Sequence, residues 1–386
     1  MPIIPVNEQR RREVAVLVGL RTGRAPRWAA EDSLEELARL AESAGASPRH
    51  TVLQERPAPD PRTLIGAGKV GELRALCREG VDVVIVDEDL SGSQQRNLER
   101  ELGCKVIDRA GLILDIFAQR ARTREGKLQV ELAQLQYLLP RLTRQWTHLE
   151  RLGGGIGTRG PGETQLESDR RRLRVRMARI RRDLRKVRRH RGVLRRPRQK
   201  IPIAVLALVG YTNAGKSCLL NALTHARAYV ADKLFATLDP TLRKVRLPSG
   251  RAALLSDTVG FIRKLPPQLV EAFKATLEEV QEADALVHVI DASHPQAAEQ
   301  RRVVERVLEE LGVAGKPVLA VHNKIDLLPL AAAAALAREE GAAAISALTG
   351  QGLPALRKAL DALLDATRIP CPAPRAPAVA EEGATG

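Results

Sequence analysis

Aromatic residues are scarce in this chain of 386 residues. They make up 2% of the sequence, although hydrophobic residues make up 44%. A hydrophobic share of this size is typical of globular proteins rather than disordered ones. The cores must therefore be built from Leu, Val, Ile and Ala. A stacking platform for single-stranded nucleic acid, which needs aromatic rings, is disfavoured.

Cysteines and long hydrophobic runs are also lacking. The four cysteines lie far apart in the sequence and show no metal-binding spacing, and they are Cys77, Cys104, Cys218 and Cys371. We interpret them as reduced thiols of a cytosolic protein. No hydrophobic run reaches the length of a membrane span, and the first 20 residues lack the core of a signal peptide. We therefore expect a cytoplasmic protein.

The positive charge of the chain is concentrated in one segment. The formal net charge is +16, and residues 141–200 alone hold 21 basic residues against five acidic ones, a surplus of 16. The rest of the chain is balanced. A basic stripe predicts a polyanionic partner. The alternative is a solvated helix face, but helices stabilised by ion pairs mix both signs.

Strand and helix signals alternate through residues 13–122. Hydrophobic runs such as "VDVVIVDED" are followed by amphipathic segments such as "SQQRNLERELG". This alternation predicts a small parallel α/β domain, to which we assign residues 1–122.

Hydrophobic residues, mostly leucines, then repeat in heptad register. One series starts at Leu128, and a second runs from Leu166 to Val187. Two heptad helices joined by a loop predict an antiparallel helical hairpin, here residues 123–197. We expect Pro140 to kink its first arm and the glycines of residues 153–162 to lie at its tip.

Alternation returns in residues 198–368, which contain five hydrophobic strand-like runs. "DPTLRKVRLPSG" adds a predicted edge strand, and residues 369–386 form a Pro/Ala-rich tail that we expect to be disordered. The first run leads into "GYTNAGKS", which fits G-x-x-x-x-G-K-[ST] between a strand and a helix. Glycines let backbone N–H groups surround phosphates. Lys216 would neutralise the outer phosphates, and Ser217 would bind Mg²⁺.

Three further motifs follow later strands. "DTVG" places Asp257 to hold Mg²⁺ and Gly260 to donate its N–H to a γ-phosphate. In "NKID", Asp326 can accept hydrogen bonds from guanine N1–H and N2–H₂, which adenine does not offer, while Lys324 covers the base and Asn323 bridges loops. "SAL" offers the Ala347 N–H to guanine O6. Parallel strands bring all four motifs to one sheet edge, so we predict a GTPase domain.

The predicted nucleotide-binding residues are Gly210, Tyr211, Thr212, Asn213, Ala214, Gly215, Lys216, Ser217, Cys218, Phe235, Thr237, Asp257, Gly260, Asn323, Lys324, Asp326, Ser346 and Ala347. Ser217, Thr237 and Asp257 are the predicted magnesium ligands, and Lys216, Thr237 and Gly260 the catalytic residues. Thr241 competes with Thr237 as the switch threonine, and we favour Thr237. Phe261 stands where Ras-like proteins place a glutamine that orients water, so we expect slow hydrolysis that needs a partner.

Several motifs together resemble the HflX GTPases, ribosome-associated members of the Obg-related group. They are "YLLPRL", "IGTRGPGETQLESDRR", "GYTNAGKS", "LFATLDPT", "SDTVGFIRKLP" and "NKID", within a resemblance over residues 13–368. It implies a GTPase that binds the large ribosomal subunit and separates stalled or idle ribosomes, often under stress. It also implies that the hairpin tip reaches ribosomal RNA near the peptidyl transferase centre. Many family members continue into a further C-terminal domain, where this chain has only the Pro/Ala tail.

The candidate RNA-binding residues are Gly157, Thr158, Arg159, Gly160, Arg170, Arg171, Arg172 and Arg174. Asn213 resembles the residue of cation-activated relatives, which predicts stimulation by K⁺. Some members are credited with ATP binding through the N-terminal domain, but "LIGAGKVGE" (64–72) lacks a full phosphate-loop pattern and is interpreted as a turn opening a helix.

We expect a monomer that binds GTP and GDP. Two alternatives stay open beside ribosome splitting: an assembly or anti-association GTPase that never splits ribosomes, and a non-enzymatic RNA-binding module. The complete GTP motif set disfavours the last.

Overall fold

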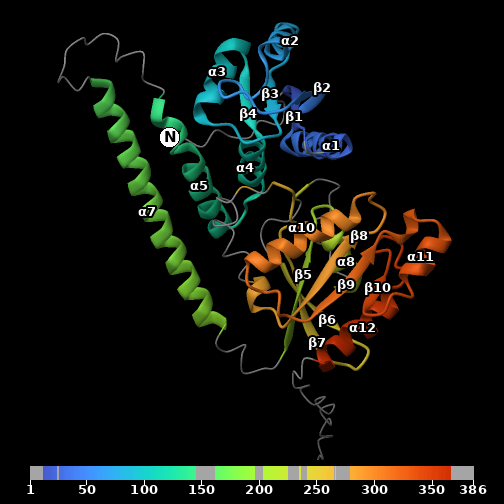
Figure 1. Ribbon diagram of the computed structural model, residues 1–386. Helices are drawn as coiled ribbons and strands as arrows, with labels where there is room; N and C mark the ends of the chain where they lie inside the picture. Colours follow the sequence, from blue (N-terminus) through green and yellow to red (C-terminus); the bar gives the residue numbers. More distant parts are fainter. Residues whose placement is uncertain are drawn as a thin grey trace, which may run out of the picture. The chain divides into compact units, whose positions relative to one another are not determined.

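The computed structural model describes residues 12–23, 26–144, 161–195, 203–224, 234–235, 241–264, 266 and 279–366. Contacts divide the chain, drawn in Figure 1, into two compact units. The first unit comprises residues 1–187, 231–239 and 264–275, and the second comprises residues 188–230, 240–263 and 276–386. Four described residues from within the predicted GTPase domain, Leu234, Phe235, Lys264 and Pro266, thus belong to the first unit. Nothing in the sequence pattern predicted this exchange.

The first unit contains a four-stranded parallel sheet in the order β2-β1-β3-β4. Its strands are β1 (Val14–Thr22), β2 (Ser47–Arg56), β3 (Val83–Val86) and β4 (Lys105–Asp108). Its helices are α1 (Arg27–Ala44), α2 (Ala67–Arg78), α3 (Gly92–Leu102) and α4 (Arg109–Arg120). All four residues of β3 are buried, as expected for a hydrophobic run inside a parallel sheet. The predicted α/β region is confirmed.

Local signals explain where these helices begin. Ser91 and Gln94 form a capping box at the start of α3, which satisfies two backbone N–H groups that a helix start leaves unpaired. Gly66 is the N-cap of α2, and its N–H donates to Gln54. The segment "LIGAGKVGE" is therefore the turn that opens a helix, as interpreted from the sequence.

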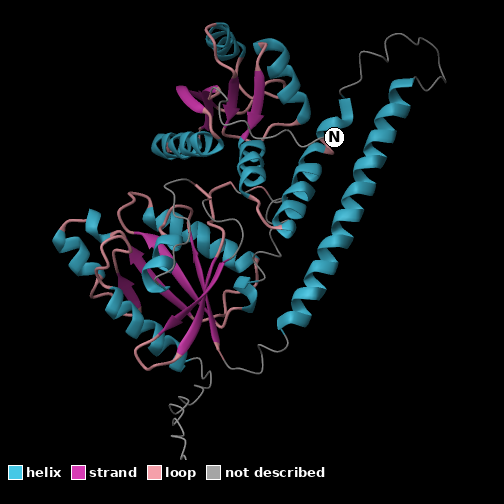
Figure 2. Cartoon of the chain, turned by 180° about the vertical axis from the view of Figure 1, so that it is seen from behind, coloured by secondary structure: helices cyan, strands magenta, loops and turns pink. Residues whose placement is uncertain are grey.

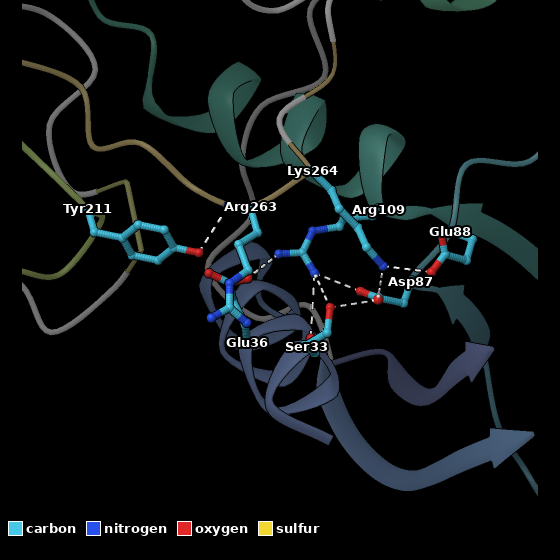
Figure 3. Close-up of polar contacts among 8 residues, drawn as sticks. All are labelled: Ser33, Glu36, Asp87, Glu88, Arg109, Tyr211, Arg263 and Lys264. Atoms are coloured by element: carbon cyan, nitrogen blue, oxygen red, sulfur yellow. Dashed lines mark hydrogen bonds and ion pairs between the residues drawn. The ribbon is translucent and has the colours of Figure 1, made fainter. Parts of the chain in front are cut away.

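A buried cluster of charges lies at the carboxyl ends of β3 and β4 (Figure 3). Arg109 is 1% exposed and donates to Asp87 Oδ1 at 2.6 Å and to Glu36. Ser33 and Lys264 both donate to Asp87 Oδ2, at 2.7 and 2.6 Å. Burial alone would raise the pKa of Asp87, but the charges of Arg109 and Lys264 outweigh it and hold that pKa below its usual value.

Two cysteines that are remote in the sequence meet in this unit. The Sγ atoms of Cys77, in α2, and Cys104, just before β4, lie 2.7 Å apart. Both thiols are free and half-buried, and burial together with the contact to Cys77 raises the pKa of Cys104 to about 12. The prediction of separate reduced thiols did not anticipate this contact, because the spacing of 27 residues carries no signal.

Helices α5 (Arg124–Leu138) and α7 (Pro161–Arg195) run side by side in opposite directions, as both views show (Figures 1 and 2). Leu132 of α5 packs with Met177, Ile180 and Leu184 of α7. Arg176 donates twice to Glu131 across the pair, at 2.7 and 3.0 Å. These contacts follow the predicted heptads and form the antiparallel pair expected from them.

The kink expected at Pro140 is wrong. Helix α5 ends at Leu138, and a short 3-10 helix, η1 (Arg141–Arg144), follows the proline. Proline has no backbone N–H, so it ends the hydrogen-bond ladder instead of bending it. The predicted tip residues Gly157, Thr158, Arg159 and Gly160 lie outside the described residues.

The second unit is built on a six-stranded sheet in the order β10-β9-β8-β5-β7-β6, flanked by helices (Figure 2). The strands are β5 (Ala204–Gly210), β6 (Thr241–Arg246), β7 (Ala252–Asp257), β8 (Ala285–Asp291), β9 (Val318–Asn323) and β10 (Ala342–Ala344). Helices in its described part include α8 (Lys216–Thr224), α10 (Ala297–Glu310), α11 (Leu330–Leu336) and α12 (Leu353–Ala366). The short 3-10 helix η3 (Ile325–Leu327) follows β9. All of these strands are parallel except β6, the predicted edge strand.

In the described part of the chain, no helix is both long and apolar enough to cross a membrane. A core cluster of the second unit consists of aliphatic side chains, such as Leu206 and Val287 of the strands and Leu220 and Leu360 of the helices. This matches a sequence with few aromatic residues.

A buried histidine makes the second unit sensitive to acid. His288, in β8, is 3% exposed, and burial lowers its pKa to about 4 from an ordinary value of 6.5. The unfolded chain therefore takes up a proton before the folded chain does, so stability is lost as pH falls from about 6.5 to about 4. We expect a loss of about 2 kcal/mol between pH of about 7.5 and about 5 from this residue. Urea unfolding at both pH values measures it. A His288→Gln variant should lose less stability on acidification, and equal losses would contradict the assignment.

Candidate functional site

The phosphate-loop motif connects β5 to α8, as its sequence predicted. Gly210 ends the strand and Lys216 begins the helix. Gly215 has φ +94°, and a Cβ at this position would lie 2.2 Å from Nδ2 of Asn323. Only glycine fits both the left-handed backbone and the close side chain. The loop thus depends on glycine at the position that the motif prescribes.

Lys216 is buried against its own loop. Its Nζ donates to the carbonyl oxygens of Gly210 and Tyr211 at 3.1 and 2.8 Å. Burial lowers the pKa of Lys216 to about 8, and the nearby charge of Asp257 opposes that shift. A desolvated ammonium beside backbone N–H groups is suited to binding phosphate oxygens.

The other predicted residues of the loop are also largely buried. Tyr211 and Thr212 are 5% and 7% exposed, and Ala214 is fully buried. Asn213 lies at the turn of the loop with φ +62°, a conformation that Asn adopts more readily than most residues. The Cys218 thiol, one residue after Ser217, donates to the Ala347 carbonyl at 3.5 Å. This hydrogen bond therefore connects the start of α8 to the segment at Ala347 that is predicted to contact the guanine base.

Ser217 and Asp257 meet at the same sheet edge. The Ser217 hydroxyl donates to Asp257 Oδ2 at 2.6 Å, and Asp257 is 1% exposed. A hydroxyl and a carboxylate are hard oxygen ligands of the kind that Mg²⁺ prefers, so this pair fits that ion. Among the described residues, no group of three or more His, Cys, Asp or Glu could hold a metal. Mg²⁺ commonly takes its other ligands from water and substrate phosphates.

Asn323 joins three of the predicted motifs. Its Nδ2 donates to the Ala214 carbonyl at 2.8 Å, and its Oδ1 accepts the Ala347 N–H at 3.0 Å. This is the loop-bridging role predicted for Asn323. The Ala347 N–H, predicted to meet guanine O6, therefore needs to change partner before it can do so. Ser346 is fully buried beside it, and its N–H donates to the Gln351 carbonyl.

The remaining residues of the "NKID" motif lie at the end of β9. Lys324 has φ +65° and donates to Asp291 Oδ2 at 2.6 Å. Asp326 follows in η3 with an exposed side chain. Asp291, which ends the hydrophobic run "ALVHVID", was missed by sequence reasoning. Asp291 lies at the end of a hydrophobic strand, and the same position in the sequence identified Asp257 as a candidate site residue.

The residues after "DTVG" lie against the phosphate loop. Phe261 forms a parallel bridge with Tyr211: its N–H donates to the Gly210 carbonyl at 3.1 Å, and its own carbonyl accepts the Thr212 N–H at 2.7 Å. The Phe261 side chain is 2% exposed. It is therefore a packed residue, and its ring offers no hydrogen bond to a water molecule.

Two predicted site residues are not among the described residues of the second unit. Phe235, predicted to bind nucleotide, belongs to the first unit, where its ring lies 4.6 Å from that of Phe117 in α4. The Phe235 side chain is 2% exposed, and no sequence pattern indicated this burial. Thr237 lies outside the described residues, whereas its competitor Thr241 begins β6.

The candidate RNA contacts on α7 form an exposed basic face. Arg171, Arg172 and Arg174 are exposed, and Arg170 is partly buried. Arg172 pairs with Asp169 at 3.3 Å, and α7 carries few such acidic residues. A helix face on which nearly all charges are positive is suited to binding a polyanion.

Comparisons with known proteins agree with this geometry. Three family models match: "GTP-binding GTPase N-terminal" over residues 31–118, "GTP-binding GTPase Middle Region" over 120–198, and "50S ribosome-binding GTPase" over 205–324. The chain is 56% identical to GTPase HflX of Caldanaerobacter subterraneus subsp. tengcongensis over 78% of this chain and 70% of that protein. It is 51% identical to GTPase HflX of Escherichia coli K12, over 85% of this chain and 78% of that protein.

A solved structure is also similar over almost the whole chain. The complex of SsGBP with GDP is 27% identical, with a TM-score of 0.50, and the match covers 92% of this chain and 99% of that one. The similarity thus extends over both units.

Proposed function

Since the chain belongs to the HflX family of GTPases, we propose that it binds the large ribosomal subunit and uses GTP to separate stalled or idle ribosomes into subunits. GTP hydrolysis is the activity of the family. One observation supports this proposal most strongly. The same chain contains the full set of GTP-binding motifs, which follow neighbouring strands of one sheet, and the helix α7, whose charged residues are mostly arginines. The family description "50S ribosome-binding GTPase" supports the large subunit as the partner.

In this proposal the nucleotide residues have separate tasks. The loop from Gly210 to Cys218 encloses the phosphates, and Asp326, Lys324 and Ala347 read the guanine base. Bound Mg²⁺, held by Ser217, Asp257 and Thr237, would offset the negative charge that develops on the phosphates. Lys216 and the Gly260 N–H would stabilise the same charge from the protein side. Asn213 supports stimulation by K⁺, and equal rates in Na⁺ and K⁺ would refute it.

Sedimentation tests the proposal directly. Intact ribosomes are incubated with the protein and GTP, GDP or no nucleotide, and then separated on a sucrose gradient. We expect GTP to shift whole ribosomes to subunits, and a Lys216→Gln variant to leave them intact. The alternative, an assembly or anti-association factor, predicts intact ribosomes in this test but blocked joining of purified subunits.

Phe261 predicts that hydrolysis depends on the ribosome. Without a glutamine to orient water, we expect slow hydrolysis alone and an increase of about 10³-fold or more with large subunits, within the range of known GTPase activation. Phosphate release under single-turnover conditions measures both rates. A rate unchanged by saturating large subunits would contradict the prediction.

The basic face of α7 predicts strong dependence on salt. Replacing Arg171, Arg172 and Arg174 with Gln removes three cations, so the slope of log K against log[salt] should become shallower by about 2 to 3. Filter binding of large subunits across a salt series measures this slope. A control variant loses the same number of positive charges outside α7. In it, Gln replaces Arg62, Arg78 and Arg100. An unchanged slope in the α7 variant would exclude this face as the docking element.

A further inference from the structure

The first unit brings together two thiols that are remote in the sequence. Cys77 lies in the last turn of α2, and Cys104 follows the end of α3 and directly precedes β4. Their Sγ atoms are 2.7 Å apart, and both cysteines are free thiols. Adjacent thiols are the arrangement from which oxidation forms a disulfide.

Contacts that do not involve sulfur hold the two positions together. Arg74, three residues before Cys77, donates from Nε to the Glu101 carbonyl at 2.6 Å. Its guanidinium also pairs with the Glu101 carboxylate at 3.8 Å. Glu101 is in turn three residues before Cys104, so the ends of α2 and α3 lie side by side. The packing of these two helices therefore sets the position of both thiols.

Both thiols border the hydrophobic core and are still accessible to small molecules. They pack against the core cluster of this unit, which contains Leu73 of α2, Leu102 of α3 and Val106 of β4. Both side chains are only half-buried. A small oxidant such as hydrogen peroxide can therefore reach them, and a bond between them would connect elements that share one core.

The surroundings of Cys104 indicate which thiol reacts first. Burial, together with the contact to Cys77, raises the pKa of Cys104 to about 12. Because the thiolate is the nucleophile, Cys104 is a poor first target for an oxidant at neutral pH. A cysteine that is oxidised first often lies next to a second cysteine that resolves it. Cys77 is accordingly assigned the first role and Cys104 the second.

We propose that Cys77 and Cys104 are a peroxide-reactive pair that forms a reversible disulfide and thereby stabilises the first unit. The Cys77 sulfur attacks hydrogen peroxide, the O–O bond breaks, and Cys77 sulfenic acid and one water form. The Cys104 sulfur then bonds to the Cys77 sulfur. The sulfenic oxygen leaves with the Cys104 proton as a second water, so two thiols lose two electrons and one peroxide gains them. A reduced dithiol reverses the reaction by thiol–disulfide exchange.

The disulfide would restrict the unfolded chain. Cys77 and Cys104 are 27 positions apart, and β3 and α3 lie between them. In the chain-entropy account, closing a loop of this length lowers the equilibrium constant for unfolding by about 10²–10³-fold. Oxidation should therefore make the first unit harder to unfold, and this effect does not depend on nucleotide or ribosome binding.

Mass spectrometry tests the chemistry on the full chain. The wild type is treated with hydrogen peroxide, its remaining thiols are alkylated, and disulfide-linked peptides are identified. We expect a link between Cys77 and Cys104 that dithiothreitol removes. In a Cys104→Ala variant, dimedone should trap sulfenic acid on Cys77, whereas Cys77→Ala should give far less label on Cys104. The absence of the link, or a link from Cys77 to Cys218 of the second unit in its place, overturns the proposal.

Urea unfolding distinguishes a stabilising disulfide from incidental oxidation. Tryptophan fluorescence is followed for the oxidised and the reduced form of each protein. In the wild type, the equilibrium constant for unfolding should be about 10²-fold or more lower in the oxidised form. Cys77→Ala and Cys104→Ala should each show no difference between their two forms, a comparison that is independent of any cost of the substitution itself. Equal unfolding of both wild-type forms, or the same gain in the two variants, contradicts the stabilising role.

Discussion

Replacing Asp326 with Asn should reduce GTP affinity by about 10–10²-fold, since a hydrogen bond to a charged group contributes about 1.5–3 kcal/mol and one of the two is lost. The carboxylate accepts both N1–H and N2–H₂ of guanine. An amide replaces one acceptor oxygen with a donor, which then faces the guanine amino group. The exposed position of Asp326 after β9 leaves its carboxylate accessible to a base.

The same Asp326→Asn change should create a new preference. Xanthosine triphosphate carries a carbonyl oxygen where guanine has its amino group, and the introduced amide could donate to that oxygen. Competition against a fluorescent nucleotide measures GTP, ATP and xanthosine triphosphate together. Asp365→Asn, which alters an aspartate that is 68% exposed on α12, is the control. A variant that still prefers GTP over both competitors would remove Asp326 from the base-reading role.

Arg109→Met should destabilise the first unit by about 3–5 kcal/mol, because it removes a buried cation that pairs with two carboxylates. Asp87, 4% exposed, and Glu36 would both lose their ion pair with Arg109. This loss is a large share of the roughly 5–15 kcal/mol that stabilises a typical domain. Lys264 would remain as a partner of Asp87, so the expected loss is at the lower end of the range given for Arg109→Met.

Tryptophan fluorescence during urea unfolding measures this effect selectively. Both tryptophans of the chain, Trp28 and Trp146, fall within the residues assigned to the first unit. Arg62→Met is the matched control, since Arg62 pairs with Glu101 while 64% exposed, and an exposed pair is worth at most about 1 kcal/mol. Adding Asp87→Asn and Glu36→Gln to the Arg109 variant should recover part of the loss. Equal costs for Arg109→Met and Arg62→Met would contradict this account.

The strands and the phosphate loop could be predicted because their signals are local. Hydrophobic runs such as "VDVVIVDED" and "IPIAVLALVG" mark buried strands by themselves, and each nucleotide motif directly follows such a run. The glycine requirement at Gly215 is a local property too. Asn323 could be assigned a bridging role because parallel strands end at one edge.

Other features depend on contacts that no local pattern encodes. The Arg109 cluster joins residues from Ser33 to Lys264, and the Cys77–Cys104 contact joins two elements that separately show only ordinary packing. The ring of Phe235 contacts that of Phe117, which lies far away along the chain. Pro140 was misjudged because a proline can either bend a helix or end it, and packing decides between them.

The length of α7 gives the basic face a mechanical consequence. A helix of 35 residues is about 52 Å long at a rise of about 1.5 Å per residue. A rotation of such a helix by about one tenth of a radian about one end would displace the other end by about 5 Å. Small angular changes at one end of the helix become displacements larger than an atomic contact at the other.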